Sequence, residues 1–405
     1  MRIKDICDYV SRGATPDYVD ESPYKVMNQA TFSKGWLDES NVRYTSKAIQ
    51  DAQIQKGDLI MASTGGGVLG KVFYYDSDDN HFYADSHVSI LRNSRGTNLM
   101  KYLYYFFSVR YDEINATLVK GSTNQTELQR NYLLAYELDI PSLQVQQRIV
   151  EYLDAKIAEI DKKIELLGKK RDAYKRLKTA TINHAVIRGL DEHVKLKDTD
   201  IDWIGEIPVH WETRRIKDEV EVNKLTLTES TSPMYKFRYI DISNVSSEGV
   251  ISFIEEVYFY EAPSRARRIV QKGDIIVSTV RTYLKSIGMI DFDAKDVVVS
   301  TGFAVLSPIK SYSKYFYYLL RSNHLIDEIC ALSSGVSYPA IAATRIESIN
   351  IPVPPLEEQK QIAAYLDERC AKIDAAVTII DKQIDALKRL KRSLINEVVT
   401  GKRTI

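Results

Sequence analysis

Two long stretches of the chain carry apolar residues at alternating steps of four and three, with charged residues at the positions between them. This heptad spacing is typical of coiled-coil helices, whereas the apolar positions of a half-buried strand alternate. The apolar positions are Leu153, Ile157, Ile160, Ile164 and Leu167 in the first stretch and Leu366, Ile373, Val377, Ile380, Ile384 and Leu387 in the second. We predict long helices over residues 141–190 and 353–405 that pair antiparallel through these positions. Two independent surface helices are the alternative.

The two stretches are copies of one another. The pattern Leu-x-x-Gln-x-x-Ile-x-x-Tyr-Leu-Asp begins at Leu143 and again at Leu356, which is 213 residues later. The regions before them repeat as well, since Arg-Ile-Lys-Asp at residues 2–5 returns at 215–218 and Lys-Gly-Asp at 56–58 returns at 272–274. The sequence therefore predicts a duplication, in which each half is a globular region followed by a long helix.

Short β-rich runs separated by Gly, Asn and Asp predict strands in both globular regions. The first region has such runs at 59–62, 71–75 and 87–91 and a helical aromatic run at 99–109; the second has them at 275–278, 297–299 and 303–306, with a helix at 314–321. Prolines precede both long helices, where proline is tolerated. The predicted domains are residues 1–140 and 214–352, with a polar linker at 191–213.

The fold class that follows is α/β. Two mixed α/β domains are separated by two long antiparallel coiled-coil helices, and the internal repeat predicts approximate twofold symmetry.

Charge and cysteine content narrow the class of protein without defining it. The chain has 55 basic and 55 acidic residues, so it lacks the overall positive charge of a simple electrostatic nucleic-acid binder. Its three cysteines, Cys7, Cys330 and Cys370, have no paired spacing, which is typical of reduced thiols and argues against a zinc site. We find no signal peptide and no apolar run that could span a bilayer, and we expect a cytoplasmic protein.

The motifs that resemble catalytic or cofactor sites fail on context. Gly65, Gly67 and Gly70 match a dinucleotide or phosphate loop in spacing, but Val72 stands where magnesium binding needs Ser or Thr, and a strand follows instead of a helix. The Pro-Pro and Pro-Asp pairs lack the neighbours that methyltransferase and nuclease motifs require, and the six histidines show no metal-ligand spacing. We predict no catalytic residue, cofactor site or metal site on this chain.

Polar and cationic residues at corresponding loops of the two regions are the candidates for DNA binding. Arg and Lys neutralise phosphates or bind guanine, and Asn and Gln pair with adenine edges. For each of these residues taken alone, a solvated surface position is the favoured interpretation; their recurrence at corresponding loops is what favours binding for the group. The candidates are Ser63, Thr64, Lys71, Arg92, Arg95, Ser122, Thr123, Asn124 and Gln125 in the first region and Arg265, Arg267, Arg268, Arg281, Tyr283, Lys285, Ser334, Ser337 and Tyr338 in the second.

Taken in order, these motifs resemble a specificity subunit of a type I DNA restriction–modification system over the whole chain. The residues that carry the resemblance are Ile-Pro-Ser-Leu-x-x-Gln at 140–146, Ile-Pro-Val-Pro-Pro-Leu-Glu-Glu-Gln at 351–359, Trp-Ile-Gly-Glu-Ile-Pro-x-His-Trp at 203–211 and the two Lys-Gly-Asp motifs. The first copy departs from the pattern at Val145, where the second has Glu358, and residues 203–211 have no counterpart before Met1.

The resemblance implies a non-catalytic subunit in which each target recognition domain reads one half of a split double-stranded DNA site. It also implies that the helices set the spacing and dock two methyltransferase subunits, with translocase–nuclease subunits joining for cleavage. S-adenosylmethionine, ATP and magnesium would then bind those partners. A single-chain DNA-modifying enzyme and a coiled-coil scaffold are the alternatives from other classes.

Overall fold

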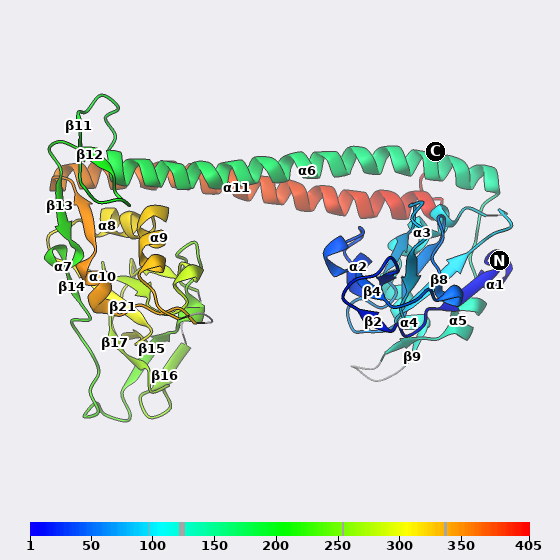
Figure 1. Cartoon of the computed structure of the whole chain (residues 1–405), viewed down its shortest axis with the longest axis horizontal. Helices are drawn as coiled ribbons and strands as arrows, with labels where there is room; N and C mark the ends of the chain where they lie inside the picture. The colour runs from blue at the N-terminus through cyan, green and yellow to red at the C-terminus, as the bar shows by residue number, and fades with distance from the viewer. Residues whose placement is uncertain (97, 121–125, 253–254, 336–337) are drawn as a thin grey trace. The chain divides into compact units, whose positions relative to one another are not determined.

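The computed structural model describes residues 1–96, 98–120, 126–252, 255–335 and 338–405. The chain forms two compact units, one of Met1–Gly168 with Lys382–Ile405 and the other of Lys169–Asp381. Each unit holds one globular domain together with one end of each long helix, α6 (Leu143–Arg188) and α11 (Leu356–Val399), as labelled in Figure 1. Both domains combine helices with sheets, which confirms the predicted α/β class.

The domain of unit 1 contains two four-stranded sheets. One has the order β1-β8-β5-β6 and is antiparallel throughout; the other has the order β2-β4-β3-β7 and contains one parallel pair, β3 with β7. The strands are β1 (Tyr9–Arg12), β2 (Tyr18–Val19), β3 (Lys25–Met27), β4 (Arg43–Thr45), β5 (Leu59–Ala62), β6 (Val72–Tyr74), β7 (Phe82–Ala84), β8 (Val88–Arg92), β9 (Val119–Lys120) and β10 (Glu127–Leu128). The helices are α1 (Ile3–Ile6), α2 (Gln29–Phe32), α3 (Met100–Ser108), α4 (Tyr111–Thr117) and α5 (Arg130–Ala135).

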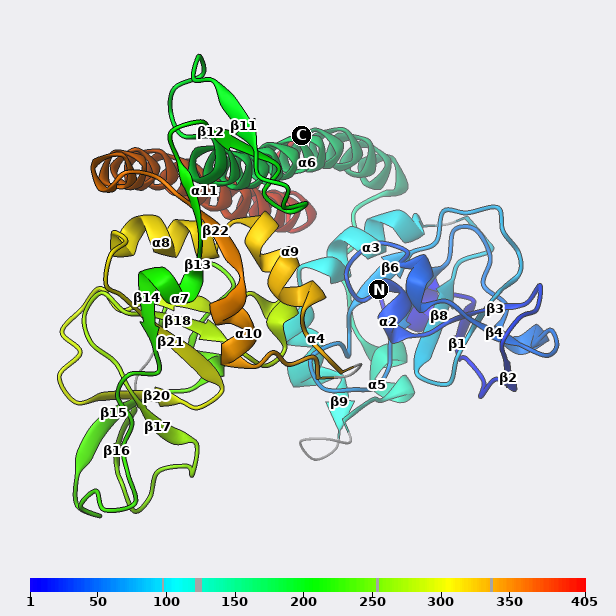
Figure 2. The same cartoon turned by 60° about the vertical axis from the view of Figure 1, so that its left-hand side comes forward.

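The domain of unit 2 repeats the strand order of the first sheet and the parallel pair of the second, but the fourth strand of the second sheet lies at the opposite edge, where β17 pairs with β20, whereas β2 pairs with β4 in unit 1 (Figure 2). Its sheets have the orders β14-β21-β18-β19 and β16-β15-β20-β17, and β15 with β20 is again the parallel pair. The strands are β13 (Glu212–Arg215), β14 (Val220–Val222), β15 (Lys236–Ile240), β16 (Glu255–Tyr258), β17 (Ala266–Ile269), β18 (Ile275–Ser278), β19 (Ile287–Met289), β20 (Val297–Ser300), β21 (Phe303–Pro308) and β22 (Asn350–Val353). The helices are α7 (Ile216–Glu219), α8 (Ser313–Leu320), α9 (Asn323–Ala331) and α10 (Ala343–Ser348).

The segment at residues 191–213 differs from the polar linker that the sequence predicts. It contains the antiparallel pair β11 (Leu196–Asp198) and β12 (Glu206–Pro208), and Ile207 and Trp211 are fully buried in the core of unit 2. The few apolar residues of this segment follow neither a helix period nor a strand period, so its many polar residues led to the prediction of a linker. Burial of large side chains fixes the segment to the domain nonetheless.

Both units contain one end of an antiparallel helix pair. In unit 1, Leu153, Ile157 and Ile160 from the first half of α6 share a buried cluster with Leu394 and Val398 near the end of α11. In unit 2 the end of α6 shares a cluster with the start of α11, including Leu366. The predicted pairing residues Leu153, Ile157, Ile160, Leu366, Ile373, Ile380 and Ile384 are buried, and Ile164, Leu167, Val377 and Leu387 are half-buried. All of the predicted pairing residues are therefore at least partly shielded from solvent.

Charged residues that interrupt the apolar face are paired across the two helices. The Lys178 ammonium lies 2.6 Å from the Asp374 carboxylate in unit 2, and the Lys391 ammonium lies 2.7 Å from the Asp161 carboxylate in unit 1. A shift of 213 residues converts Asp161 into Asp374 and Lys178 into Lys391, so the two ion pairs are the same contact with the helices exchanged. The duplication therefore extends to the register of the helix pair.

The polar contacts between each domain and the helices also occur twice. The Gln146 side chain accepts a hydrogen bond from the Leu99 N–H at 2.9 Å and donates one to the Pro141 carbonyl at 2.9 Å. The Asp154 carboxylate lies 2.7 Å from the Lys101 ammonium. The corresponding contacts in unit 2 are those of Gln359 with Tyr312 and Pro354 and of Asp367 with Lys314. The structurally constrained side of each domain is thus the side on the helices, and divergence is concentrated in the loops.

Candidate nucleic-acid interface

Four separate segments of the second domain meet at one open cavity of about 810 Å³. They are the turn after β15, the loop between β16 and β17, the loop between β18 and β19, and the loop that contains Tyr338. Three predicted DNA-binding residues, Arg265, Arg281 and Tyr338, line this cavity together. The structure therefore brings together residues that are up to 73 positions apart in the sequence, from Arg265 to Tyr338.

Arg281 has an uncommon backbone and an aromatic support. Its φ is +51°, a left-handed conformation that costs free energy for a residue other than Gly, Asn or Asp. Of the five described non-glycine residues with positive φ, three are Asp or Asn, and the other two are Arg281 and Lys285 of this one loop. The Arg281 guanidinium lies 4.6 Å from the ring centre of Tyr338, whose side chain is 66% exposed. Strained backbone of this kind gathers at binding sites, where surrounding contacts maintain it.

Arg265 is held from one side and open on the other. Its guanidinium forms an ion pair with the Asp241 carboxylate, and its Nε lies 3.4 Å from the Tyr239 hydroxyl, while the side chain remains 57% exposed. A carboxylate that fixes a guanidinium leaves its planar N–H edge oriented, and such an edge can pair with two acceptors on guanine or on a phosphate.

The first domain has the same loop arrangement with different chemistry. The backbone of Thr64 forms an antiparallel β-bridge with Glu127 in unit 1, and Val280 forms the same kind of bridge with Ala340 in unit 2. In both domains, the loop after the second strand of the first sheet therefore contacts a segment that lies later in the chain. In unit 1 the Thr64 hydroxyl lies 2.8 Å from His87 Nδ1 and accepts a hydrogen bond from the Gln29 amide at 2.9 Å. Amide, hydroxyl and imidazole groups thus stand where the second domain has guanidinium groups and a phenol.

Gln29 and His87 are site residues that the sequence analysis missed. Gln29 begins α2, directly after β3, and His87 lies in the turn before β8; both contact Thr64. Only an alignment of β3 with β15 through their shared parallel pairing would have identified Gln29.

Four predicted candidates serve the fold, which corrects their assignment. Ser63 is buried and hydrogen-bonded to the Ser89 hydroxyl at 2.5 Å, and Arg92 is paired with the buried carboxylate of Asp58 at 2.7 Å. Two others lie on β17: Arg267 over the Phe259 ring at 4.7 Å, and Arg268 with a buried Nε. These side chains are directed by strand register, which isolated sequence motifs do not reveal.

The remaining candidates are dispersed. Arg95 and Tyr283 are exposed, and Ser334 pairs through its backbone with Ala340. Lys285 lines a separate crevice of about 430 Å³ beside α6 and α9, where its ammonium lies 3.5 Å from the Asn323 amide oxygen, and Lys71 lines a crevice of about 360 Å³ in unit 1. Ser122, Thr123, Asn124, Gln125 and Ser337 lie outside the described residues.

Comparison with known proteins identifies the family of the chain. The family described as the type I restriction modification DNA specificity domain matches residues 1–167 and 208–389, most of the chain and once in each half. The chain therefore belongs to this family, whose members are the DNA-recognition subunits, not the catalytic ones, of type I restriction–modification systems. These subunits bind DNA and assemble with other subunits of their systems.

Individual relatives agree along the full length. The chain is 26% identical over 419 residues to a putative type I restriction enzyme MjaX specificity subunit of Methanocaldococcus jannaschii, covering 99% of this chain and 92% of that protein. It is 25% identical to the MjaVIII specificity subunit of the same organism, with the same coverage.

Solved structures show the same fold. A chain from work on complex assembly and conformational transition of the type I R-M system superposes with a TM-score of 0.72 at 16% identity, covering 98% of this chain and 96% of that one. The HsdS subunit from Thermoanaerobacter tengcongensis superposes with a TM-score of 0.53 at 18% identity, covering 100% and 96%. In the described part of the chain, no helix has the length and apolar character needed to cross a membrane.

Proposed function

We propose that each globular domain reads one half of a bipartite double-stranded DNA target and that the paired helices set the spacing between the halves. The observation that carries this proposal is the contrast between constant and variable parts. The contacts of each domain with the helices repeat at a 213-residue shift, while the facing loops carry Arg265, Arg281 and Tyr338 in one domain and Gln29, Thr64 and His87 in the other. One scaffold with two chemically different binding surfaces fits a target with two different halves.

The partners follow from the same duplication. A helix pair whose ion pairs and domain contacts occur twice offers two equivalent docking surfaces, and we propose that two methyltransferase subunits occupy them. Translocase–nuclease subunits would join that complex for cleavage. We propose that S-adenosylmethionine, ATP and magnesium bind those partners in the cytoplasm and that this chain needs no cofactor of its own.

Arg281 in the cavity of the second domain and Lys285 in the separate crevice allow a direct test of base reading against phosphate contact. We expect Arg281→Ala to weaken binding of the true target alone by about 1–3 kcal/mol, because a base contact contributes only on the matching sequence. We expect Lys285→Ala to weaken matched and mismatched DNA alike and to lower the slope of affinity against salt by about one. Binding titrations at several salt concentrations measure both, on a target identified by methylome sequencing of the host with and without the gene.

Lys272→Ala is the matched control for these titrations. Lys272 is an exposed lysine in the turn before β18, and the loop with Arg281 follows the end of the same strand. If Lys272→Ala weakened binding as much as Arg281→Ala, or if neither loop substitution changed the affinity at any salt concentration, the cavity would not be the reading site.

A further inference from the structure

The cavity of about 810 Å³ in the second domain carries an apolar surface beside its two arginines. Ile242 and Val280 are half-buried and line it together with the buried Val245, and Leu284, which is 42% exposed, lines it as well. None of these four side chains has a hydrogen-bonding group. The polar contacts expected of the arginines therefore leave this apolar surface without a role.

The same place in the first domain is polar. There the Gln29 amide donates a hydrogen bond to the Thr64 hydroxyl, which also contacts His87 Nδ1. The parallel strand pairs, the two β-bridges and the hydrogen bonds after β5 and β18 relate these three positions to three positions of the second domain. The corresponding pairs are Gln29 and Ile242, Thr64 and Val280, and His87 and Gly302.

The change from polar to apolar involves these positions as a set. An added Cβ at Gly302 would lie 2.6 Å from Ile242 Cδ1, so a histidine at this position would clash with the isoleucine. The glutamine and histidine of one domain and the isoleucine and glycine of the other are thus two mutually exclusive ways to fill one place in the fold. Each domain presents one of them as a whole.

Backbone contacts hold the apolar surface in position. The Arg281 N–H donates a hydrogen bond of 2.7 Å to the Pro339 carbonyl, and Val280 forms its β-bridge with Ala340. The Leu284 N–H closes the loop with a hydrogen bond of 2.8 Å to the Arg281 carbonyl. A surface fixed in this way loses little conformational entropy when a ligand binds.

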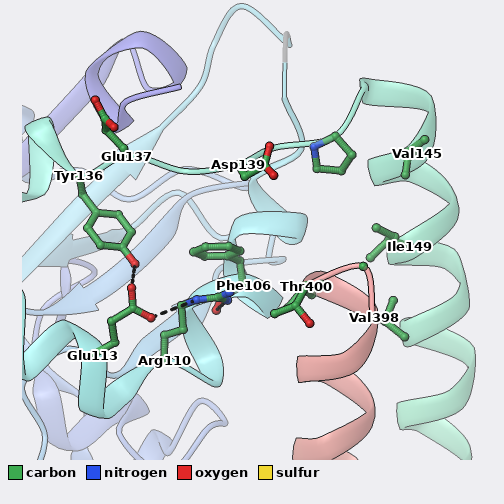
Figure 3. Close-up of a pocket in the computed structure, with 13 residues that line it drawn as sticks. Phe106, Arg110, Glu113, Tyr136, Glu137, Asp139, Val145, Ile149, Val398 and Thr400 are labelled. Atoms are coloured by element: carbon green, nitrogen blue, oxygen red, sulfur yellow. Dashed lines mark hydrogen bonds and ion pairs between the residues drawn. The ribbon is translucent and has the colours of Figure 1, made fainter. Parts of the chain in front are cut away.

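Charge distinguishes this cavity from the cavity of about 450 Å³ in unit 1 that Figure 3 shows. There, Glu113, Glu137 and Asp139 face one guanidinium, that of Arg110, which gives the lining a formal net charge of −2. Glu113 also binds both Arg110, at 3.3 Å, and the Tyr136 hydroxyl. The second-domain cavity has two guanidinium groups and one carboxylate, a formal net charge of +1, so its apolar surface lies where a polyanionic duplex is attracted.

We propose that this apolar surface reads the 5-methyl group of a thymine in the half-site of the second domain. The inference rests on the proposed function, in which this domain reads one half of the target. The 5-methyl group of thymine is the only methyl group that unmodified DNA presents in the major groove, and apolar side chains recognise it by contact. Ile242 and Val280 make that contact, and the arginines of the same cavity bind polar groups beside it.

The two domains then differ in what they require of a pyrimidine. In the first domain the corresponding positions carry amide, hydroxyl and imidazole groups, which suit the hydrogen-bonding edges of bases and not a methyl group. Dependence on a thymine methyl group at this place is therefore a property of the second half-site, and it depends on Ile242.

The test uses the full-length chain and duplexes that carry the target identified by methylome sequencing. Each thymine of the two halves is replaced in turn by deoxyuridine, which keeps the base-pairing groups and removes only the methyl group. Fluorescence anisotropy measures the affinity. We expect at least one replacement in the second half to weaken binding about fourfold, because burial of one methyl-sized group contributes about 0.8 kcal/mol.

Variants of Ile242 assign this effect to the cavity. We expect Ile242→Ala to reduce the deoxyuridine effect in the second half to less than about twofold, as a double-mutant cycle between the side chain and the methyl group requires. Ile242→Gln, which installs the side chain of the first domain, should do the same without leaving a void. Ile309→Ala is the matched control, since Ile309 is a 55% exposed apolar residue of the same domain outside the cavity lining, and it should leave the effect unchanged.

Three results would overturn the inference: a second half without thymine, no deoxyuridine effect in that half, or an effect that persists in both Ile242 variants with wild-type melting curves. In each case tight binding of the target over unrelated DNA would leave the proposed function standing. If the chain bound its target no more tightly than unrelated DNA, the proposed function would fall as well.

Discussion

A buried aspartate occupies the same position in both domains but has different partners. Asp58 and Asp274 both accept a hydrogen bond at 2.7 Å from the backbone N–H three residues earlier. Asp58 is paired with Arg92 through two contacts of 2.7 Å, whereas strand register places Ser307 opposite Asp274. Burial raises the pKa of Asp274, although the Ser307 hydroxyl and the Gln271 N–H act in the opposite direction. The same fold position is thus stabilising as an ion pair in one domain and costly as a lone charge in the other.

This difference predicts opposite results for one substitution. We expect Asp58→Asn to destabilise the chain by roughly 2–4 kcal/mol, slightly less than breaking a fully buried pair, because it leaves the Arg92 charge, only 18% exposed, without its carboxylate. We expect Asp274→Asn to be neutral or stabilising at pH 7. Denaturant unfolding of the full chain with a probe in each domain measures both.

The pH dependence gives an independent check on Asp274. Because its pKa is raised in the folded state, its contribution is most favourable below the pKa of the unfolded chain and is lost as the pH rises through the folded value. The stability gained by Asp274→Asn over wild type should therefore grow from pH 4 to pH 7. Equal losses for both substitutions at pH 7 would contradict this account.

At the residue scale, the sequence could indicate types of side chain but not their directions. Arg281 and Tyr338, which the sequence analysis names as separate loop candidates, lie 4.6 Å apart from guanidinium to ring centre, whereas Arg92, also a candidate guanidinium, is bound to Asp58. The deciding factor is which strand neighbour faces the buried carboxylate, and a one-residue change of register would reverse it. Sequence motifs do not indicate the pairing register of the strands.

At the scale of elements, the apolar face and the ion pairs of the long helices contribute differently. Ile160 and Ile373 are each 7% exposed, while the pair of Lys178 with Asp374 is 24% and 58% exposed. Ion pairs with that exposure contribute about 0.2–1 kcal/mol, whereas a polar group placed at a packed apolar position costs several times more.

We therefore expect Ile160→Asn or Ile373→Asn to lower the free energy of unfolding by roughly 2–5 kcal/mol. Lys178→Met, the control on the same face, should change it by less than about 1 kcal/mol. Urea unfolding followed by circular dichroism measures all three. If Lys178→Met were as costly as Ile373→Asn, charge pairing and not apolar packing would hold the helices together.

The elements most accurately predicted are those with long periodic patterns. Repeated heptads locate α6 and α11, helices of 46 and 44 residues, because every further turn adds the same evidence. The segment before β13 was not predicted, because Ile204, Ile207 and Trp211 are too few to establish a period and are buried only through tertiary contacts. Similarly, no pattern in the sequence indicates that β3 and β7 pair in parallel, which depends on contacts between residues more than fifty positions apart.

At the scale of the whole molecule, the repeated contacts make each domain an exchangeable part. Gln146 and Asp154 in one copy and Gln359 and Asp367 in the other hold their domains through backbone groups and through the same lysine–aspartate ion pair. A domain from another family member that keeps these contacts should therefore fold onto the same helices.

We expect replacement of residues 1–140 by the first domain of another family member to change one half of the methylated site and to leave the other half and the spacing unchanged. The second domain keeps its own cavity with Arg265 and Arg281, and the helix pair keeps its length and register. Methylome sequencing of hosts that carry the wild-type and exchanged genes reads both halves at once. A change in both halves would mean that the two domains read the target jointly. A change in the spacing alone would mean that the first domain contributes to the spacer and not to sequence recognition.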